Sequence, residues 1–194
     1  MGRVDFTDRG ARIEGLLRGA SVDSESLMLG EQSTIPEAVR PIEHKDRDAI
    51  EALLRATQSF RENEIKVALE VIDAYVLHPE EDYAALGAFT PGGELLGYVC
   101  FGPTPCTVGT WDLYWIAVTP AAQGTGVGTM LLQEVERRLA RTDARLVIIE
   151  TSSLPSYAAS RAFYQRRGYE VVARVPDFYA TGDDRLIFAK RIHN

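Results

Sequence analysis

Asp112-Leu-Tyr-Trp-Ile-Ala-Val-Thr-Pro-Ala-Ala-Gln-Gly-Thr-Gly-Val-Gly-Thr129 is the stretch of sequence that best indicates the fold. Its apolar first part, residues 113–118, contains two aromatic side chains and predicts a buried strand. Pro120 ends this strand, and the closely spaced glycines after it predict a turn. Apolar residues then recur every four positions from Val127 to Leu139, which predicts a helix with one buried face.

A strand, a glycine turn and a helix in this order predict a phosphate-binding site. The first amides of a helix have no partner within the helix, and the helix dipole favours an anion next to them. We therefore expect a phosphorylated ligand here, although a tight turn that binds nothing would leave the same pattern. A loop for nucleoside triphosphates would need a lysine after Gly128, where Thr129 stands. A dinucleotide-binding loop would need a glycine three positions after Gly126, which is again Thr129.

Hydrophobic periodicity and turn residues predict the other elements of the chain. Strands are expected at residues 39–42, 83–89, 95–101, 110–118, 145–151, 169–175 and 185–191, and helices at 46–56, 62–77, directly after the glycine turn, and 154–167. A loop, 176–184, is expected between the last two strands. This order predicts an α+β fold, a mixed α/β sandwich, rather than a doubly wound sheet.

The chain of 194 residues has the length of one domain with an additional arm. Residues 1–37 show little periodicity, and we expect an N-terminal arm that is partly disordered or docked on a neighbour. Residues 38–194 are expected to form the folded domain. An apolar content of 45% is sufficient for a proper core.

Charge and cysteine content narrow the range of functions. A net charge of -7 argues against nucleic acid as a partner, since a basic surface would be needed. Cys100 and Cys106 have neither the number nor the spacing of a disulfide framework or a metal site, so no metal is expected. The opening residues lack the apolar core of a signal peptide, and no apolar run approaches membrane-spanning length. We expect a cytoplasmic protein without a membrane partner.

Two motifs together resemble those of the GNAT superfamily of N-acetyltransferases. Gln123-Gly-Thr-Gly-Val-Gly128 resembles its (Gln/Arg)-x-x-Gly-x-(Gly/Ala) signature, in the usual setting between a strand and a helix. Phe163-Tyr-Gln-Arg-Arg-Gly-Tyr169 resembles its second motif, Phe-Tyr-x-x-x-Gly-(Phe/Tyr). The resemblance extends over about residues 39–192. It implies a central, mostly antiparallel twisted sheet with about four helices.

The resemblance also implies acetyl-CoA as the co-substrate. In this superfamily the backbone at the end of the fourth strand pairs with the pantetheine arm, and the glycine turn holds the pyrophosphate. Glycines allow a close approach of the backbone, and amides without partners supply hydrogen-bond donors. The positions concerned are Ile116, Ala117 and Val118 for the pantetheine, and Gln123, Gly124, Thr125, Gly126, Val127, Gly128 and Thr129 for the pyrophosphate.

The transfer of an acetyl group to an amine needs a base for the ammonium proton and an acid for the departing thiolate. Tyr164 stands where many members of the superfamily have a tyrosine acid. Asp112 is the first candidate for the base, because it lies six residues before Val118 and has the expected strand parity of Ile116 and Val118. Glu150 is the second candidate. A relay of water molecules without a single base stays an alternative.

The acceptor is expected to be a small cationic or amino-acid-like compound with a primary amine. The first two helices and the last loop usually recognise the acceptor in this superfamily, which here places Glu64, Asp177 and Tyr179 as candidates. Acidic and aromatic groups attract an ammonium ion. Ordinary solvated turn residues would give the same composition. The alternatives are a sensor that binds acyl-CoA without catalysis, or an acetyltransferase for a peptide or protein amine. A homodimer is also compatible with the resemblance.

Overall fold

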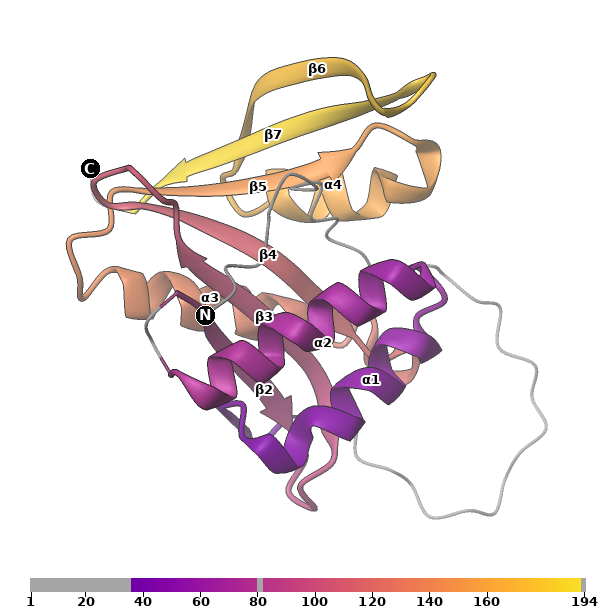
Figure 1. The fold of residues 1–194 in the computed structure, drawn as a ribbon, viewed down its shortest axis with the longest axis vertical. Helices are drawn as coiled ribbons and strands as arrows, with labels where there is room; N and C mark the ends of the chain where they lie inside the picture. Colours follow the sequence, from indigo (N-terminus) through magenta and orange to yellow (C-terminus); the bar gives the residue numbers. More distant parts are fainter. Residues whose placement is uncertain (1–35, 80–81, 193–194) are drawn as a thin grey trace.

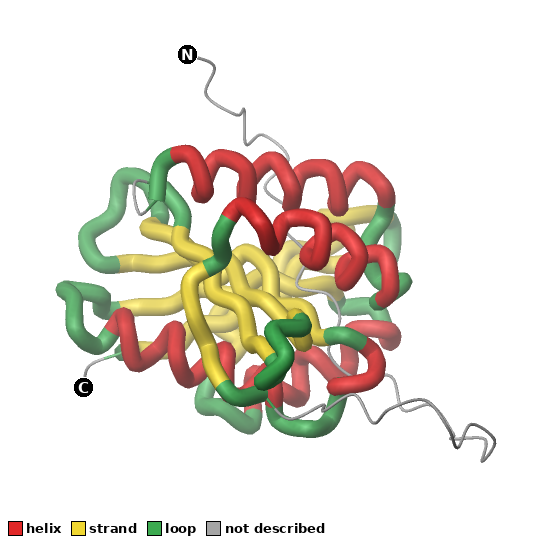
Figure 2. Tube along the Cα trace, turned by 90° about the horizontal axis from the view of Figure 1, so that it is seen from below, coloured by secondary structure: helices red, strands yellow, loops and turns green. Residues whose placement is uncertain are grey.

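The computed structural model of this protein describes residues 36–79 and 82–192 (Figure 1). Nearly all of the predicted N-terminal arm, residues 1–37, lies outside the described residues. The described part contains a seven-stranded sheet with helices on both faces, as Figure 2 shows from another side. The order of helices and strands along the chain agrees with the sequence-based prediction.

The strands follow one another across the sheet in the order β1-β2-β3-β4-β5-β7-β6. All neighbours are antiparallel except β4 and β5, which are parallel, so the expected mixed and mostly antiparallel sheet is confirmed. The strands are β1 (Ala38–Pro41), β2 (Ala84–Phe89), β3 (Leu95–Pro103), β4 (Thr110–Val118), β5 (Leu146–Ser152), β6 (Glu170–Ala180) and β7 (Asp183–Arg191).

Two hydrophobic clusters lie on the two faces of the sheet. Side chains of β3 alternate between them, because successive residues of a strand point to opposite faces: Val99 belongs to one cluster, and Tyr98 and Cys100 to the other. Helices α3 (Val127–Leu139) and α4 (Ala158–Gln165) cover the face with Val99, whereas α1 (Arg47–Ala56) and α2 (Glu62–Leu77) cover the opposite face. Helix α4 is shorter than predicted, because its expected first turn, Pro155–Tyr157, is a 3₁₀ turn.

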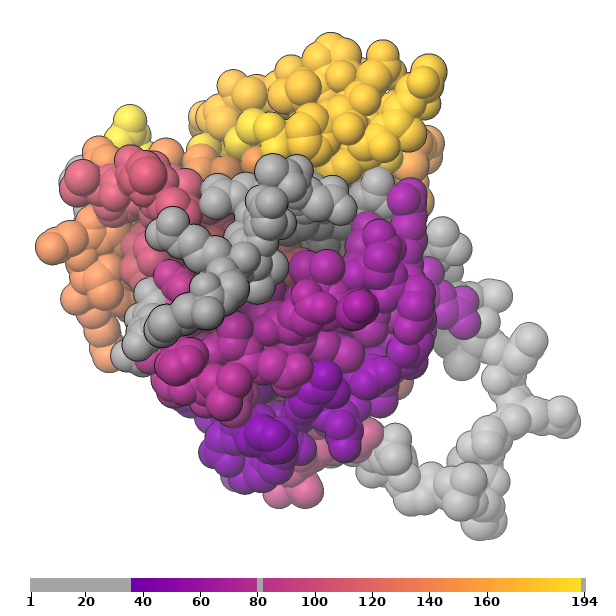
Figure 3. Space-filling view, viewed as in Figure 1, coloured from indigo at the N-terminus to yellow at the C-terminus, as the bar shows by residue number. Residues whose placement is uncertain are grey.

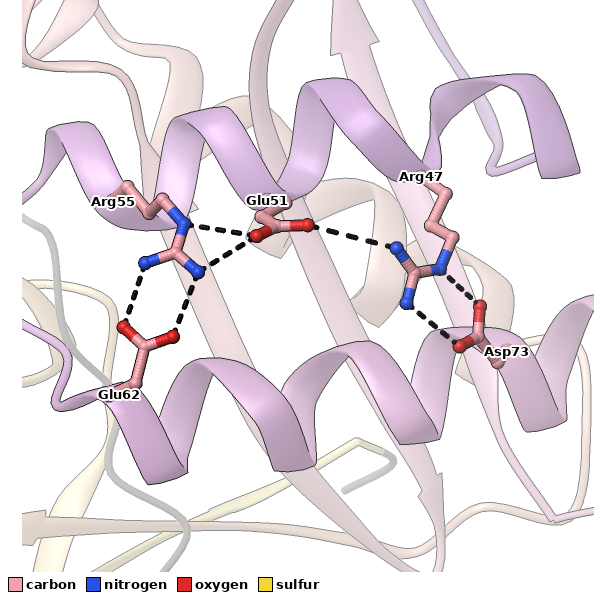
Figure 4. A network of polar contacts seen from close by, with 5 residues as sticks. All are labelled: Arg47, Glu51, Arg55, Glu62 and Asp73. Atoms are coloured by element: carbon pink, nitrogen blue, oxygen red, sulfur yellow. Dashed lines mark hydrogen bonds and ion pairs between the residues drawn. The ribbon is translucent and has the colours of Figure 1, made fainter.

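An ion-pair network on the surface joins α1 to α2 (Figure 4). Arg47 binds the carboxylate of Asp73 at 2.6 Å, and Arg55 binds that of Glu62 at 2.8 Å. Glu51 lies between the two arginines and contacts both. Because all five side chains are substantially exposed, solvent screens these ion pairs and each contributes little to stability. Hydrophobic burial therefore holds α1 and α2 on the sheet, and the ion pairs add to the contact between the two helices.

The prediction of a loop at residues 176–184 is wrong for most of this range. Strands β6 and β7 leave only residues 181–182 between them. The pairing of the two strands skips residues 176–179, which bulge out of the ladder. The backbone N–H of Asp177 donates to the carboxylate of Asp184 at 2.9 Å, and this bond draws the segment into the ribbon. In the space-filling view the β6–β7 ribbon forms one end of the molecule (Figure 3).

The parallel strands β4 and β5 are paired only along the first part of β4. The register runs from Thr110–Leu146 to Leu113–Ile149 and ends there. Beyond Leu113 the two strands diverge (Figure 1). In the described part of the chain, residues 115–118 therefore pair with β3 alone and present backbone groups without a strand partner on the β5 side.

Gly109 connects β4 to the beginning of β5. Its carbonyl oxygen accepts hydrogen bonds from the N–H groups of Arg145 at 2.7 Å and Leu146 at 3.2 Å. Its φ is 70°, and a Cβ atom at this position would lie 2.4 Å from the backbone oxygen of Asp143. Only glycine meets both conditions, since other residues rarely adopt this φ and have no room here.

Gly109→Ala is expected to destabilise the protein by more than the ~1–3 kcal/mol that left-handed backbone strain costs alone. Gly93→Ala is the matched control, because Gly93 has a φ of 84° but nothing within 4 Å of the added Cβ atom. Urea unfolding of both variants measures the difference in the free energy of unfolding. Equal losses for the two variants would contradict a contribution from the contact with Asp143.

Candidate active site

The glycine turn presents a group of backbone donors at the start of α3. Gly124 and Gly126 have φ values of 80° and 100°, and nothing lies within 4 Å of where their Cβ atoms would be. Among the described residues, no acceptor pairs with the amides of Gly124, Gly126, Val127, Gly128 and Thr129. Donors without partners at a helix N-terminus, in front of open space, have the chemistry to bind an anion.

The turn is held in shape by bonds within itself and to β4. The side-chain amide of Gln123 donates to the carbonyl of Val118 at 3.2 Å, and the hydroxyl of Thr125 donates to that of Ala122 at 2.8 Å. The backbone amides of Gln123 and Thr125 donate inside the turn, to Pro120 and Ala122, at 3.3 Å each. These two residues therefore shape the turn, and the glycines with the first residues of α3 supply the donors.

The three residues predicted to pair with pantetheine lie on the diverging half of β4. Ile116, Ala117 and Val118 pair with β3 on one side, and the described residues offer no strand on the other. This row of backbone groups leads directly into the glycine turn. An extended ligand can therefore pair with β4 as an additional strand and place an anionic group at the start of α3.

Tyr164 of α4 is fully buried on the face of the sheet that α3 and α4 cover. Its ring packs against those of Tyr169 and Phe188, with centroids 6.1 Å and 5.9 Å away. Its hydroxyl has no hydrogen-bond partner among the described residues, and burial raises the pKa of this hydroxyl well above its ordinary value of 10.0. Tyr164 is therefore a neutral hydroxyl that donates a hydrogen bond to no group among the described residues.

Thr151 provides a second buried hydroxyl on the same face, and the sequence analysis missed it. It follows Val147 and Ile149 on β5, two positions beyond the last pairing with β4. Its side chain is completely buried, and its hydroxyl has no partner in the described part of the chain. An unpaired buried hydroxyl costs about 1–3 kcal/mol, which is consistent with a role in binding. The sequence does carry a signal for it: the inward-facing residues of this strand are Val147, Ile149 and Thr151, and only the third of them has a hydroxyl group.

The predicted parity of Asp112 is wrong, because β4 contains a bulge. Cys100 pairs with Trp115 and Phe101 with Leu113, so Tyr114 is the extra residue of the bulge. Leu113 and Ile116 consequently face the same cluster, and Asp112 points to the opposite face of the sheet.

Glu150 also points away from the cluster that contains Ile149, so both predicted bases lie on the face opposite Tyr164. Its carboxylate forms an ion pair with Arg185 at 3.1 Å. The sheet itself separates these two carboxylates from the unpaired hydroxyls of Tyr164 and Thr151. An acid and a base on opposite faces can act on the two sides of one reacting group that lies between the strands.

Residues 47–169 match the acetyltransferase (GNAT) family. The chain belongs to this family. The expected family, fold and enzyme class are therefore confirmed: the protein is an acetyl-CoA-dependent N-acetyltransferase. The extent of the match includes both motifs that carried the resemblance.

Relatives of this GNAT acetyltransferase support the assignment over most of the chain. An uncharacterized N-acetyltransferase of Methanocaldococcus jannaschii is 25% identical over 157 residues, which are 80% of this chain and 92% of the relative. The crystal structure of a protein from Desulfovibrio desulfuricans, described as an acetyltransferase of the GNAT family, is 37% identical with a TM-score of 0.77 and covers 80% of this chain and 98% of its own. An aminoglycoside 6'-N-acetyltransferase complexed with coenzyme A has the same fold, with 18% identity, a TM-score of 0.68 and coverage of 81% and 98%.

The predicted acceptor residues of this GNAT enzyme have local structural roles. The carboxylate of Glu64 accepts the N–H of Arg61 at 2.8 Å and caps α2. Asp177 has a φ of 52°, and its carboxylate accepts the N–H of Gly182 at 2.6 Å, which closes the turn between β6 and β7. Tyr179 packs edge-on against Phe178 with centroids 5.0 Å apart. These contacts explain the positions of the three side chains without a bound substrate. They do not test whether the three residues recognise the amine that is acetylated.

Within residues 36–79 and 82–192, no group of three histidine, cysteine, aspartate or glutamate side chains can hold a metal ion. No helix in the same ranges is both long and apolar enough to span a membrane.

Proposed function

We propose that this GNAT enzyme transfers the acetyl group of acetyl-CoA directly to the primary amine of a small cationic or amino-acid-like acceptor, within a ternary complex. The observation that carries this proposal is the buried and unpaired hydroxyl of Tyr164 beside the diverging strands β4 and β5. The acetyl-CoA would pair with Ile116, Ala117 and Val118 and place its pyrophosphate on the unpaired amides of α3. Its thioester would then lie where β4 and β5 separate.

In the proposed reaction the neutral amine attacks the thioester carbonyl from the face that carries the carboxylates. The new C–N bond forms, the C–S bond breaks, and the proton of Tyr164 passes to the departing thiolate. A base removes the proton that the amine nitrogen carries, directly or through water. Asp112 and Glu150, whose side chains lie on this face, are the candidates for this base.

The activity is expected to have no alkaline decline due to Tyr164 below pH 10, because burial holds the pKa of its hydroxyl above the ordinary value of 10.0. The fraction of neutral amine rises with pH, so the rate should rise and then level off. Initial rates of thiol release, measured from neutral pH to pH 10 at saturating acceptor, provide the test. An alkaline decline that disappeared in Tyr164→Phe would contradict the protonated role of this residue.

The nature of the acceptor is the part of the proposal that rests on charge and on relatives. The net charge of -7 favours a cationic compound, and the structurally similar aminoglycoside 6'-N-acetyltransferase is named for a small amine. A thiol-release assay over cationic amines, aminoglycosides, amino acids and peptides with a free N-terminus separates the alternatives. We expect turnover of cationic small amines.

Three other outcomes of this assay would each overturn part of the proposal. Turnover of neutral or anionic amines alone would exclude a cationic acceptor, and turnover of peptides alone would identify a peptide or protein acetyltransferase. Binding of coenzyme A by calorimetry without turnover of any amine would support an acyl-CoA sensor instead.

A further inference from the structure

Arg167 connects the end of α4 to the beginning of α3. Its guanidinium donates to the hydroxyl of Thr129, which lies 38 positions away in the first turn of α3. The same group donates to the carbonyl of Phe163 at 3.2 Å and stacks on the ring of Phe163 at 3.8 Å. Three contacts therefore hold this cation in one orientation beside the donors of the glycine turn.

The charge of Arg167 is not balanced by an ion pair among the described residues. In the part of the chain that the structure describes, no carboxylate forms an ion pair with its guanidinium, and its Nε atom is buried without an acceptor. Burial, and then the neighbouring cation of Arg166, lower the pKa of Arg167. Glu136, a carboxylate that acts on it electrostatically, is bound to Lys190 at 2.8 Å. An oriented cation without a carboxylate partner among the described residues is suited to an anion from outside the chain.

The anion that fits this place is a phosphate. The backbone amide of Thr129 is one of the unpaired donors of α3, and the hydroxyl of the same residue holds the guanidinium. The guanidinium of Arg167 and the N-terminus of α3 therefore meet at the same residue, Thr129. A planar guanidinium with N–H donors matches the geometry of phosphate oxygens.

We propose that Arg167 binds a phosphate group of acetyl-CoA, with Thr129 and Phe163 orienting its guanidinium. This inference rests on the proposed placement of the cofactor at the first turn of α3. Two parts of the cofactor carry the required chemistry, the pyrophosphate and the 3'-phosphate of the ribose, and ligand variants distinguish them.

The test measures binding of coenzyme A and of 3'-dephospho-coenzyme A by isothermal titration calorimetry, without any acceptor. Arg167→Ala is expected to weaken coenzyme A binding about 10- to 100-fold, the range for hydrogen bonds to a charged group. Arg167→Lys should recover part of this loss, because the charge remains but the planar fork does not. Arg166→Ala is the matched control, since it removes the same charge from an exposed neighbour and should change the Kd by less than about threefold. Thermal unfolding verifies that each variant is folded.

The two ligands identify which phosphate Arg167 contacts. If it binds the 3'-phosphate, the wild type binds the dephospho form more weakly and Arg167→Ala no longer distinguishes the two ligands. If it binds the pyrophosphate, Arg167→Ala weakens both ligands by the same factor. Binding of both ligands by Arg167→Ala as tightly as by Arg166→Ala would overturn the inference.

The proposed function can fail without affecting this test, because no amine is present and binding alone is measured. A wild-type protein that turned over no amine but lost affinity in Arg167→Ala would support the inference and refute the proposed catalysis. A wild-type protein that bound neither ligand would overturn both.

Discussion

Tyr164→Phe is expected to lower kcat about 10²- to 10⁴-fold while binding acetyl-CoA as well as the wild type. The substitution removes the proposed proton donor for the thiolate and leaves the ring packing against Tyr169 and Phe188 unchanged. The hydroxyl has no partner among the described residues, so its removal should also raise the free energy of unfolding by about 1–3 kcal/mol. Lower activity together with higher stability separates a catalytic hydroxyl from a structural one.

Tyr98→Phe is the control for this experiment. The hydroxyl of Tyr98 is likewise buried and lacks a partner in the described ranges, but it lies on the face covered by α1 and α2. This variant should gain stability without losing turnover. Thiol-release kinetics and urea unfolding of both variants give the comparison, and a wild-type kcat in Tyr164→Phe would show that another group protonates the thiolate.

Phe188→Ala is expected to destabilise the protein by about 3–5 kcal/mol, a large part of the ~5–15 kcal/mol that stabilises a typical domain. Phe188 on β7 is fully buried, and its ring packs against that of Tyr164. Its removal leaves a cavity behind Tyr164, because the paired strands β5 and β6 on either side of β7 cannot close around the missing ring. The cavity should loosen Tyr164 and lower kcat as well.

Urea unfolding measures the loss, and Phe178→Ala is the comparison because its ring is 41% exposed on β6. That control should cost about 1 kcal/mol or less. A loss below about 1.5 kcal/mol in Phe188→Ala would mean that the site collapses around the missing ring.

Local patterns were sufficient to predict much of the fold. The predicted helix 62–77 and strand 110–118 coincide with α2 and β4, since each depends on its own apolar periodicity and on adjacent turn residues. The glycine turn adopts the expected left-handed conformations at Gly124 and Gly126, a property of the glycines themselves. The boundaries of the last two strands were predicted poorly, because the bonds of Asp177 that draw residues 176–179 into the ribbon come from another strand.

Motifs in the sequence predicted which residues form the candidate site. They did not predict how the side chains of these residues are arranged. The roles of Tyr164, of the pantetheine strand and of the pyrophosphate turn came from a resemblance, and they remain proposals. The side of the sheet on which Asp112 lies was predicted wrongly, because the bulge at Tyr114 arises in the pairing with β3. Glu64 was chosen for its charge, yet its carboxylate caps α2.

The residues alone therefore define the order of the elements and the glycine turn, because turn conformation and side-chain periodicity act over a few neighbouring positions. The two short motifs were sufficient to indicate the family. The divergence of β4 from β5 beyond Leu113, the unpaired hydroxyls of Tyr164 and Thr151, and the contact of Arg167 with Thr129 arise only in the folded chain. Each of them depends on which distant groups meet and on which buried groups find no partner. No local pattern carries that information, because it is set by the packing of the whole sheet and its helices.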